Sequence, residues 1–242
     1  MPGELRLSPQ ISIESLGDRP FRFVNSLRST TGFRPAGAGA VPGDSAKRLV
    51  DVALGSVLLV VAAPFVAAMA GAVALGGGSP FYGHERVGRG GRSFRCWKIR
   101  TMRRDAAARL EDLLRIDPVA RRQWIVGCKL ADDPRTTRLG RFLRRTSLDE
   151  LPQLWNVVTG EMSLVGPRPV TRDELGRYGG ALARYLSVRP GITGPWQVYR
   201  QAHTTYDERV AMDRAYVEGR TLRQDALLLA LTLRVPFLPT GR

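Results

Sequence analysis

The sequence predicts a mostly helical α+β fold, and three observations predict it. Residues 52–75 carry no charge, a stretch long enough for a membrane-embedded helix. Two short alternating runs between about 81 and 99 surround a glycine-rich connection, which indicates a β-hairpin. Beyond the hairpin, apolar residues recur at helical spacing beside arginines, a pattern typical of amphipathic helices at a membrane interface.

The first segment, residues 1–46, holds proline, glycine, serine and alanine around scattered arginines, without a sustained period. We expect a poorly ordered or disordered tail there, because such a composition buries too little apolar surface to fold. The first 30 residues contain no apolar core, so nothing there resembles a secretory signal.

Pro64 divides the apolar stretch into halves of roughly 17 Å each, short of the roughly 30 Å hydrocarbon core. Proline removes one backbone hydrogen bond and bends a helix. Lys47 and Arg48 precede the stretch and four arginines follow it, and positive residues at both ends prefer the cytoplasmic side. A helix over 47–78 that kinks at Pro64 and returns to the same leaflet places the positive residues at both of its ends on the cytoplasmic side. A straight span and a buried soluble helix are the alternatives.

In the expected hairpin, Lys98 shares a face with Phe94 and Cys96 at period two, so it is a candidate for an inward-pointing cation. Only three of the 37 basic residues are lysines, which makes this choice unusual. A solvated cation at a strand end is the alternative. The hairpin comprises strands 81–87 and 93–99 joined by residues 88–91.

Two further helical segments follow. Residues 105–116 have an apolar side, and Pro118 is the expected start of a second helix. Four arginines then recur at helical spacing and form a basic stripe. Such a stripe fits a solvated helix face, a helix that contacts lipid headgroups or a helix that binds nucleic acid. The stripe consists of Arg138, Arg141, Arg144 and Arg145.

The net charge of +15 favours an anionic partner, such as nucleic acid, an acidic membrane leaflet or a phosphorylated substrate. A zinc site is not expected, because the two cysteines and two histidines lie too far apart in sequence for known zinc motifs.

Asp149 and Glu150 form an acidic pair inside a basic, proline-rich segment that runs from Arg144 to Pro169. Carboxylates hold Mg²⁺ and guanidinium groups bind phosphate, so this segment is a candidate site for phosphate chemistry. Helix capping is the alternative.

In that alternative, Ser147 and Glu150 form a capping box, or Asp149 caps a helix whose first turn contains Pro152. The two interpretations are compatible, since a helix start keeps an aspartate ionised and attracts phosphate.

Two stiff loops follow the acidic pair. Pro167 and Pro169 restrict the backbone on both sides of Arg168, so that its guanidinium loses less entropy on binding an anion. The second loop begins at Arg189 and contains two glycines, which let backbone N–H groups approach a ligand closely. A turn without a ligand is the alternative for either loop.

Together these segments resemble the bacterial sugar transferases that act as monotopic polyprenyl-phosphate phosphoglycosyl transferases. The resemblance covers about four fifths of the chain. It rests on Lys-Arg-Leu-Val-Asp at 47–51, Phe-Arg-Cys-Trp-Lys-Ile-Arg-Thr-Met at 94–102, Thr-Ser-Leu-Asp-Glu-Leu-Pro-Gln at 146–153, Gly-Pro-Arg-Pro at 166–169 and Arg-Pro-Gly-Ile-Thr-Gly at 189–194.

The resemblance implies a re-entrant membrane helix and a small catalytic domain, residues 79–242, on the cytoplasmic face of the bacterial inner membrane. It implies transfer of a phosphosugar from a UDP-sugar to polyprenyl (undecaprenyl) phosphate with release of UMP, which initiates synthesis of an exopolysaccharide or another lipid-linked glycan. The aspartate of the acidic pair, here Asp149, is the nucleophile in this family and forms a covalent phosphoglycosyl intermediate.

By the same resemblance, Asp149 binds Mg²⁺, and Glu150 supports the metal or the acceptor step. The chain departs from the family after the second loop, where Gln201 replaces an expected arginine and Arg200 stands beside it. The candidate phosphate and substrate contacts are Lys98, Arg144, Arg168, Arg189, Arg200 and Asp225.

Two other functions remain open from the sequence: a membrane-tethered nucleic-acid-binding protein, and a non-catalytic scaffold of a glycan-assembly complex. Nucleic acid is the less expected partner, because aromatic residues are not interleaved with the arginines. We expect contact with anionic membrane lipids, and the sequence leaves open a homo-oligomer or glycan-assembly partners.

Overall fold

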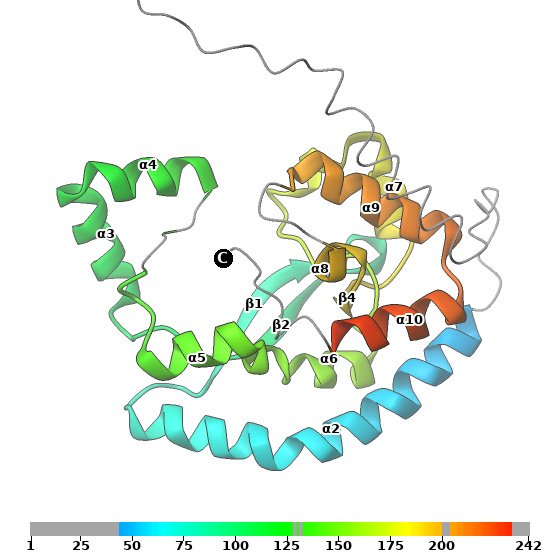
Figure 1. The fold of residues 1–242 in the computed structure, drawn as a ribbon, viewed down its shortest axis with the longest axis horizontal. Coiled ribbons are helices and arrows are strands. Elements are labelled where there is room, and N and C mark those ends of the chain that lie inside the picture. The colour runs from blue at the N-terminus through cyan, green and yellow to red at the C-terminus, as the bar shows by residue number, and fades with distance from the viewer. Residues whose placement is uncertain (1–43, 128–129, 131–132, 200–203, 234–242) are drawn as a thin grey trace, which may run out of the picture.

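The computed structural model describes residues 44–127, 130, 133–199 and 204–233, and the expected tail therefore lies almost wholly outside the described residues. The described part is mostly helical and contains one two-stranded antiparallel and one two-stranded parallel sheet, which confirms the predicted α+β class. Figure 1 shows the long helix α2, Asp44–Leu75, lying along one side of the other elements.

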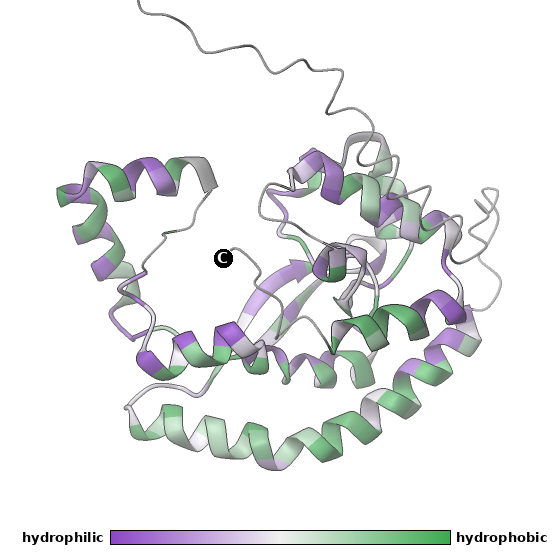
Figure 2. Cartoon of the chain, viewed as in Figure 1, coloured by the Kyte–Doolittle hydropathy of each residue, from purple (hydrophilic) through white to green (hydrophobic). Residues whose placement is uncertain are grey.

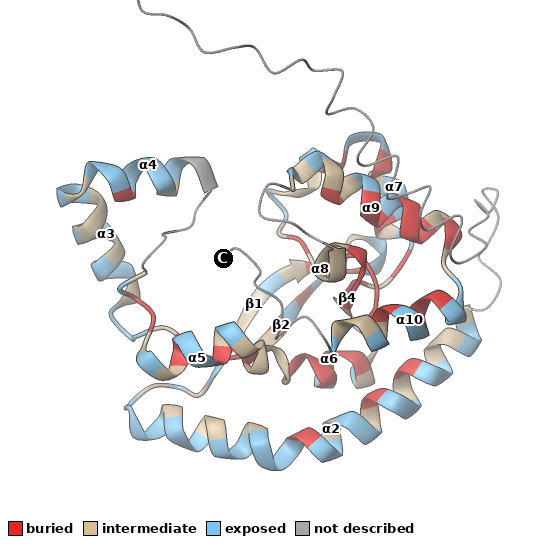
Figure 3. Cartoon of the chain, in the orientation of Figure 1, coloured by how far each residue is buried: buried red, intermediate tan, exposed pale blue. Residues whose placement is uncertain are grey.

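Helix α2 begins three residues before the predicted boundary at residue 47 and continues without a break through Pro64. Figure 1 shows it curved along its length, and the kink with return to one leaflet stays a prediction. Among the described residues it is the one helix long and apolar enough to cross a membrane. Its outer face is apolar and exposed (Figures 2 and 3), with Val60 73% and Phe65 63% exposed.

The inner face of α2 packs on helix α6, Gln153–Thr159. Gly55 is buried there, and a Cβ at this position would lie 3.1 Å from Val157 Cγ1, so the glycine permits the close approach. Arg48 donates to the carbonyl oxygens of Val157 (2.7 Å) and Val158 (2.9 Å) at the end of α6. The N-terminal half of α2 is thus fixed to the domain.

The hairpin has the predicted bounds, β1 Phe81–Val87 and β2 Ser93–Ile99. Its connection turns through Gly90 and Gly91, whose φ angles are +68° and +77°, values that glycine adopts without strain. The outer edge of β2 is closed by the buried Asn156 side chain, which accepts from the Trp97 N–H at 3.1 Å and donates to the Arg95 carbonyl at 2.8 Å. This bridge fixes β2 against α6.

The two predicted helices after the hairpin are α3, Ala106–Ile116, and α4, Pro118–Gly127. They lie to one side of the other elements in Figure 1, and α3 buries none of its residues. The basic stripe is on α5, Arg138–Thr146, which is capped by the Thr137 side chain and leaves most of its arginines exposed.

The remaining elements pack around two cores, one that includes Val157, Leu164, Tyr216 and Leu228, and a second, beside α7, that includes Tyr178 and Tyr185. The parallel pairing of β3 with β4 joins the segments that carry the two proline-rich loops, and the sequence did not predict it. These elements are β3 Ser163–Val165, α7 Leu182–Leu186, β4 Gly191–Thr193, α8 Pro195–Tyr199, α9 Tyr206–Gly219 and α10 Leu222–Thr232.

Candidate active site

The acidic pair lies in a short 3-10 turn, Leu148–Glu150, between α5 and α6. Ser147 ends α5 in the left-handed conformation (φ 59°), and its side chain makes no capping hydrogen bond. Pro152 precedes α6 as its N-cap. Both capping predictions were therefore wrong, because the left-handed Ser147 interrupts the helix and the chain makes an additional turn before α6 starts.

Asp149 is only 7% exposed, and burial raises its pKa to about 6. The neighbouring Lys98 and Arg144 charges lower this pKa, while the Glu150 charge raises it further. No helix start holds this pKa down, and loss of water outweighs the positive neighbours, yet a carboxyl with a pKa of about 6 is still largely ionised at neutral pH. A buried carboxyl with such a pKa is typical of a reactive group.

A hollow opens beside the acidic pair, between β1, β2, the start of α6 and the Arg168 loop. Lys98 Nζ lies 2.6 Å from Glu150 Oε1, so this lysine points inward as predicted and is not a solvated strand-end cation. The pair is about one quarter exposed, which leaves both groups accessible from the hollow. Six of the residues lining the hollow are Arg86, Cys96, Lys98, Glu150, Gln153 and Arg168.

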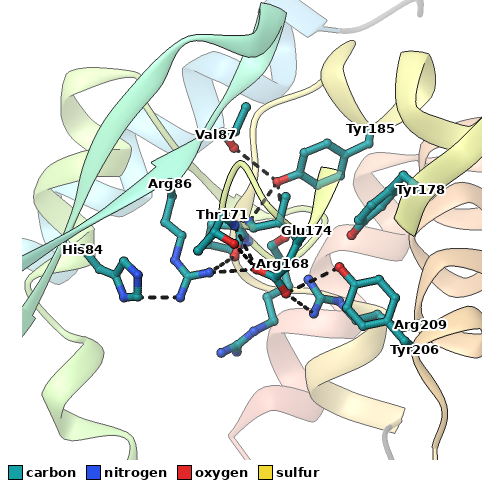
Figure 4. A network of polar contacts seen from close by, with 12 residues as sticks. His84, Arg86, Val87, Arg168, Thr171, Glu174, Tyr178, Tyr185, Tyr206 and Arg209 are labelled. Carbon is teal, nitrogen blue, oxygen red and sulfur yellow. Dashed lines mark hydrogen bonds and ion pairs between the residues drawn. The ribbon is translucent and has the colours of Figure 1, made fainter. Parts of the chain in front are cut away.

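Arg168 reaches the same hollow from the Gly-Pro-Arg-Pro loop. In Figure 4 its guanidinium points away from the polar network that holds its backbone, and among the described residues it makes no hydrogen bond or ion pair. The Tyr185 hydroxyl lies 3.2 Å from Val87 O, 3.4 Å from Arg168 O and 3.2 Å from Val170 N. The loop is therefore fixed while the arginine side chain is available to an anion.

Arg86 also lines the hollow, and sequence reasoning missed it. Its Nη1 lies 3.3 Å from Pro169 O and 3.2 Å from Glu174 Oε2 (Figure 4). Arg168 lines the same hollow, and burial together with the charge of Arg168 lowers the pKa of Arg86. The hairpin register contained the signal: Arg86 pairs with Phe94 and so shares the face of Lys98.

Arg144 does not line the hollow. Its guanidinium donates to Thr101 Oγ1 at 2.8 Å and Thr136 Oγ1 at 3.3 Å, which ties α5 to the segments on either side of the α3–α4 arm. Its charge still lowers the pKa of Asp149, so it acts on the acidic pair electrostatically.

Two other candidates lie elsewhere. Arg189 Nε donates to Gly160 O at 2.9 Å and lines a second hollow at the far end of α6. Asp225 accepts from Lys47 at 2.7 Å and from the Tyr216 hydroxyl at 2.7 Å, so it anchors the start of α2. Arg200 lies outside the described residues.

The acidic pair fits the coordination chemistry of magnesium. The described residues contain no group of three or more histidine, cysteine, aspartate or glutamate side chains that could hold a metal. Mg²⁺ needs no such cage, because it commonly binds one or two carboxylates and takes its other ligands from water and substrate phosphates. Asp149 and Glu150 supply that number of carboxylates beside a basic hollow.

Comparison with known proteins shows the family to which the chain belongs. The bacterial sugar transferase family model matches residues 43–238. The exopolysaccharide production protein ExoY of Rhizobium meliloti is 45% identical over 212 residues, which cover 86% of this chain and 94% of ExoY.

Two longer relatives match this chain over only part of their own length. The UDP-galactose-lipid carrier transferase of Erwinia amylovora is 48% identical and the undecaprenyl-phosphate galactose phosphotransferase of Salmonella typhimurium is 46% identical, each over 189 residues. The match covers 78% of this chain in both cases and 40% of each relative. With most of its length matched by the family model, this chain belongs to the bacterial sugar transferase family.

Proposed function

We propose that this protein transfers a phosphosugar from a UDP-sugar to polyprenyl phosphate and releases UMP. The observation that carries the proposal is the buried Asp149 beside a hollow whose rim is formed by Lys98, Glu150 and Arg168. The relatives support it by name, since one from Escherichia coli, 33% identical, is called UDP-glucose:undecaprenyl-phosphate glucose-1-phosphate transferase. No residue in the hollow identifies the sugar.

In the first step, an Asp149 carboxylate oxygen attacks the sugar-proximal phosphorus of the donor. The bond from that phosphorus to the bridging oxygen breaks, and the electron pair leaves with UMP. In the second step, an oxygen of polyprenyl phosphate attacks the same phosphorus and frees the carboxylate. Two steps at one carboxylate let a soluble donor and a membrane-held acceptor use the site in turn.

The surrounding side chains bind and orient the diphosphate. Arg168 and Lys98 face the hollow and neutralise phosphate oxygens, and guanidinium forks match phosphate geometry. Glu150 keeps Lys98 in position through their 2.6 Å contact. Mg²⁺ held by Asp149 and Glu150 would supply charge neutralisation for the diphosphate and the departing UMP.

The connections at the two ends of α2 support the membrane arrangement that we propose. Its first turns are fixed to the domain, since Asp51 accepts from Ser163 Oγ and Leu164 N, both buried. Its other end joins β1 of the same domain through only residues 76–80. Both ends of α2 are thus tied to one domain, which supports a re-entrant helix and a catalytic domain on the cytoplasmic face rather than a straight span.

The first expected result is a fall in activity at low pH. Asp149 attacks only when ionised and its pKa in the metal-free protein is raised to about 6, so at subsaturating Mg²⁺ kcat/KM for the donor falls about tenfold per pH unit below pH 6 and is flat above it. Stability of the metal-free protein changes in the opposite direction: the folded protein binds more protons than the unfolded chain between pH 3.8 and about 6, so stability falls as pH rises through that window. UMP release between pH 5 and 8, measured with thermal unfolding, checks both signs.

The second expected result concerns Arg168→Gln. Because this guanidinium faces the hollow without a partner among the described residues, its loss raises KM for the donor roughly 10- to 100-fold and leaves the unfolding temperature unchanged. Arg95→Gln is the matched control, since Arg95 is exposed on the opposite face of β2. An equal rise in KM in both variants would show a general effect of charge.

A direct assay of the purified full chain tests the function. The protein is incubated with a panel of UDP-hexoses and UDP-N-acetylhexosamines, polyprenyl phosphate and Mg²⁺, and both UMP and the lipid product are measured. Release of UMP together with a lipid diphosphate sugar from at least one donor is expected. Absence of both products with every donor contradicts the proposal and favours a scaffold, and DNA binding without turnover favours a nucleic-acid-binding protein.

A further inference from the structure

A second hollow lies at the other end of α6 from the acidic pair. Gln153, the first residue of α6, lines the first hollow, whereas Thr159, its last residue, lines the second. The second hollow measures about 590 Å³, within the size range of small-ligand sites. The turn of the hairpin and the loop before β4 complete its walls.

The charge of this hollow is predominantly positive. Arg89, Arg92 and Arg189 line it, and Glu161 is the one acid among its lining residues. The Glu161 carboxylate accepts from Asn156 Nδ2 at 2.6 Å and so is directed towards α6. A fourth arginine, Arg172, reaches the rim, where its Nη2 donates to Ser93 Oγ at 3.1 Å.

Contacts with other parts of the protein account for the positions of only some of these arginine side chains. Arg89 pairs with Asp44 at 2.7 Å, but Asp44 also pairs with Arg220 at 3.0 Å, so one carboxylate serves two cations. Arg189 uses its Nε on the Gly160 carbonyl. The Arg92 side chain is exposed and has no hydrogen bond or ion pair within the described part of the chain.

The arginines are close enough to repel one another. Burial and the charges of Arg48 and Arg89 lower the pKa of Arg189. Arg48 Nη2 lies 3.2 Å from the position that a Cβ of Gly160 would occupy, so the start of α2 borders this hollow. A bound anion would offset the repulsion, since three guanidinium groups from two segments, the hairpin connection and the loop before β4, line this hollow without an equal number of acids.

We propose that this second hollow, bounded by Arg89, Arg92 and Arg189, binds a phosphate group, and that it is a site separate from the acidic pair. The uncharged stretch of α2 begins at residue 52, one turn after Arg48, so a membrane-embedded α2 would bring the hollow close to the level where lipid headgroups meet water. The phosphate belongs either to an anionic lipid headgroup or to a soluble anion, and both share the chemistry that the arginines recognise.

Calorimetric titration of the full chain in a neutral detergent tests this site with three probes: dihexanoyl-phosphatidylglycerol, dihexanoylglycerol, which lacks the phosphate, and inorganic phosphate. We expect saturable binding of a phosphate probe and none of dihexanoylglycerol. Arg92→Gln raises the Kd at least tenfold, whereas Arg95→Gln on the opposite face of β2 leaves it unchanged. Binding of the lipid alone identifies a headgroup, and equal binding of inorganic phosphate identifies a soluble anion.

Lys98→Gln distinguishes the two hollows, because it removes a cation from the acidic-pair hollow only. The proposal is overturned if no phosphate probe binds saturably, if Arg92→Gln binds like wild type, or if Lys98→Gln weakens binding as much as Arg92→Gln does. Asp149→Asn retains the binding, so failure of this inference and failure of the transferase proposal are distinguishable. Arg92 is exposed, so its replacement is not expected to disturb folding.

Discussion

Replacing Asp149 by asparagine is expected to lower kcat for UMP release on the order of 10⁴-fold or more, because the amide cannot form the phosphoglycosyl intermediate. The protein should remain folded. Asparagine fills nearly the same space and removes a carboxylate whose ionised form is disfavoured by burial. Above pH 6 the unfolding temperature of the variant should therefore be no lower than that of wild type.

The matched control is Asp173→Asn, an acid-to-amide change at an exposed position on the loop after Pro169. It should retain the activity and unfolding temperature of wild type. Equal UMP release from Asp149→Asn and wild type would remove Asp149 from the mechanism, and a parallel loss of activity and stability would assign it a structural role.

The second large effect is expected for Gly191→Ala. Gly191 N donates to Pro167 O at 2.8 Å, and a Cβ at this glycine would overlap the backbone of Gly166 and the Thr193 carbonyl. The two proline-rich loops can meet only if no side chain stands between them. We expect a loss of about 3 kcal/mol in stability and a fall of roughly 6–12 °C in Tm, measured by thermal unfolding.

This change should also impair the site, because the separated loops carry Arg168 and Arg189. KM for the donor rises in the folded fraction as Arg168 moves from the hollow. Gly176→Ala is the control, since a Cβ there has no atom within 4 Å. A Gly191→Ala protein with wild-type Tm would contradict the close packing of β3 against β4.

The local signals in the sequence were sufficient for the hairpin and the long helix. Alternation over 81–87 and 93–99 with glycines between them defines both strands and their pairing, so the inward direction of Lys98 follows from local pattern alone. The uncharged stretch defines α2 in the same way. Its exact path past Pro64 depends on packing against α6, which no local pattern contains.

The local sequence pattern gave a wrong prediction where tertiary contacts determine the structure. Ser147 and Glu150 have the spacing of a capping box, yet the left-handed Ser147 ends α5 and the acidic pair enters a separate turn. The burial that raises the pKa of Asp149 comes from surrounding elements and could not be read from neighbouring residues.

The candidate site was predicted in part. Motif order indicated Lys98, Glu150 and Arg168, and the structure brings these three to one hollow. It assigns Arg189 to a different hollow and Asp225 to the anchor of α2, because the parallel β3–β4 pairing and the packing of α10 set their positions. Long-range pairing of short strands leaves little trace in sequence.

The measurement that tests the central claim most directly follows the sugar-proximal phosphate. A UDP-sugar that the enzyme accepts, labelled with ³²P at that phosphate, is mixed with the full chain and Mg²⁺ without polyprenyl phosphate, and protein-bound label is measured after rapid denaturation. We expect label on wild type, none on Asp149→Asn, and loss of the label to lipid when polyprenyl phosphate is added before denaturation. Turnover with no label on the protein, or label retained by Asp149→Asn, would contradict a covalent intermediate on this aspartate.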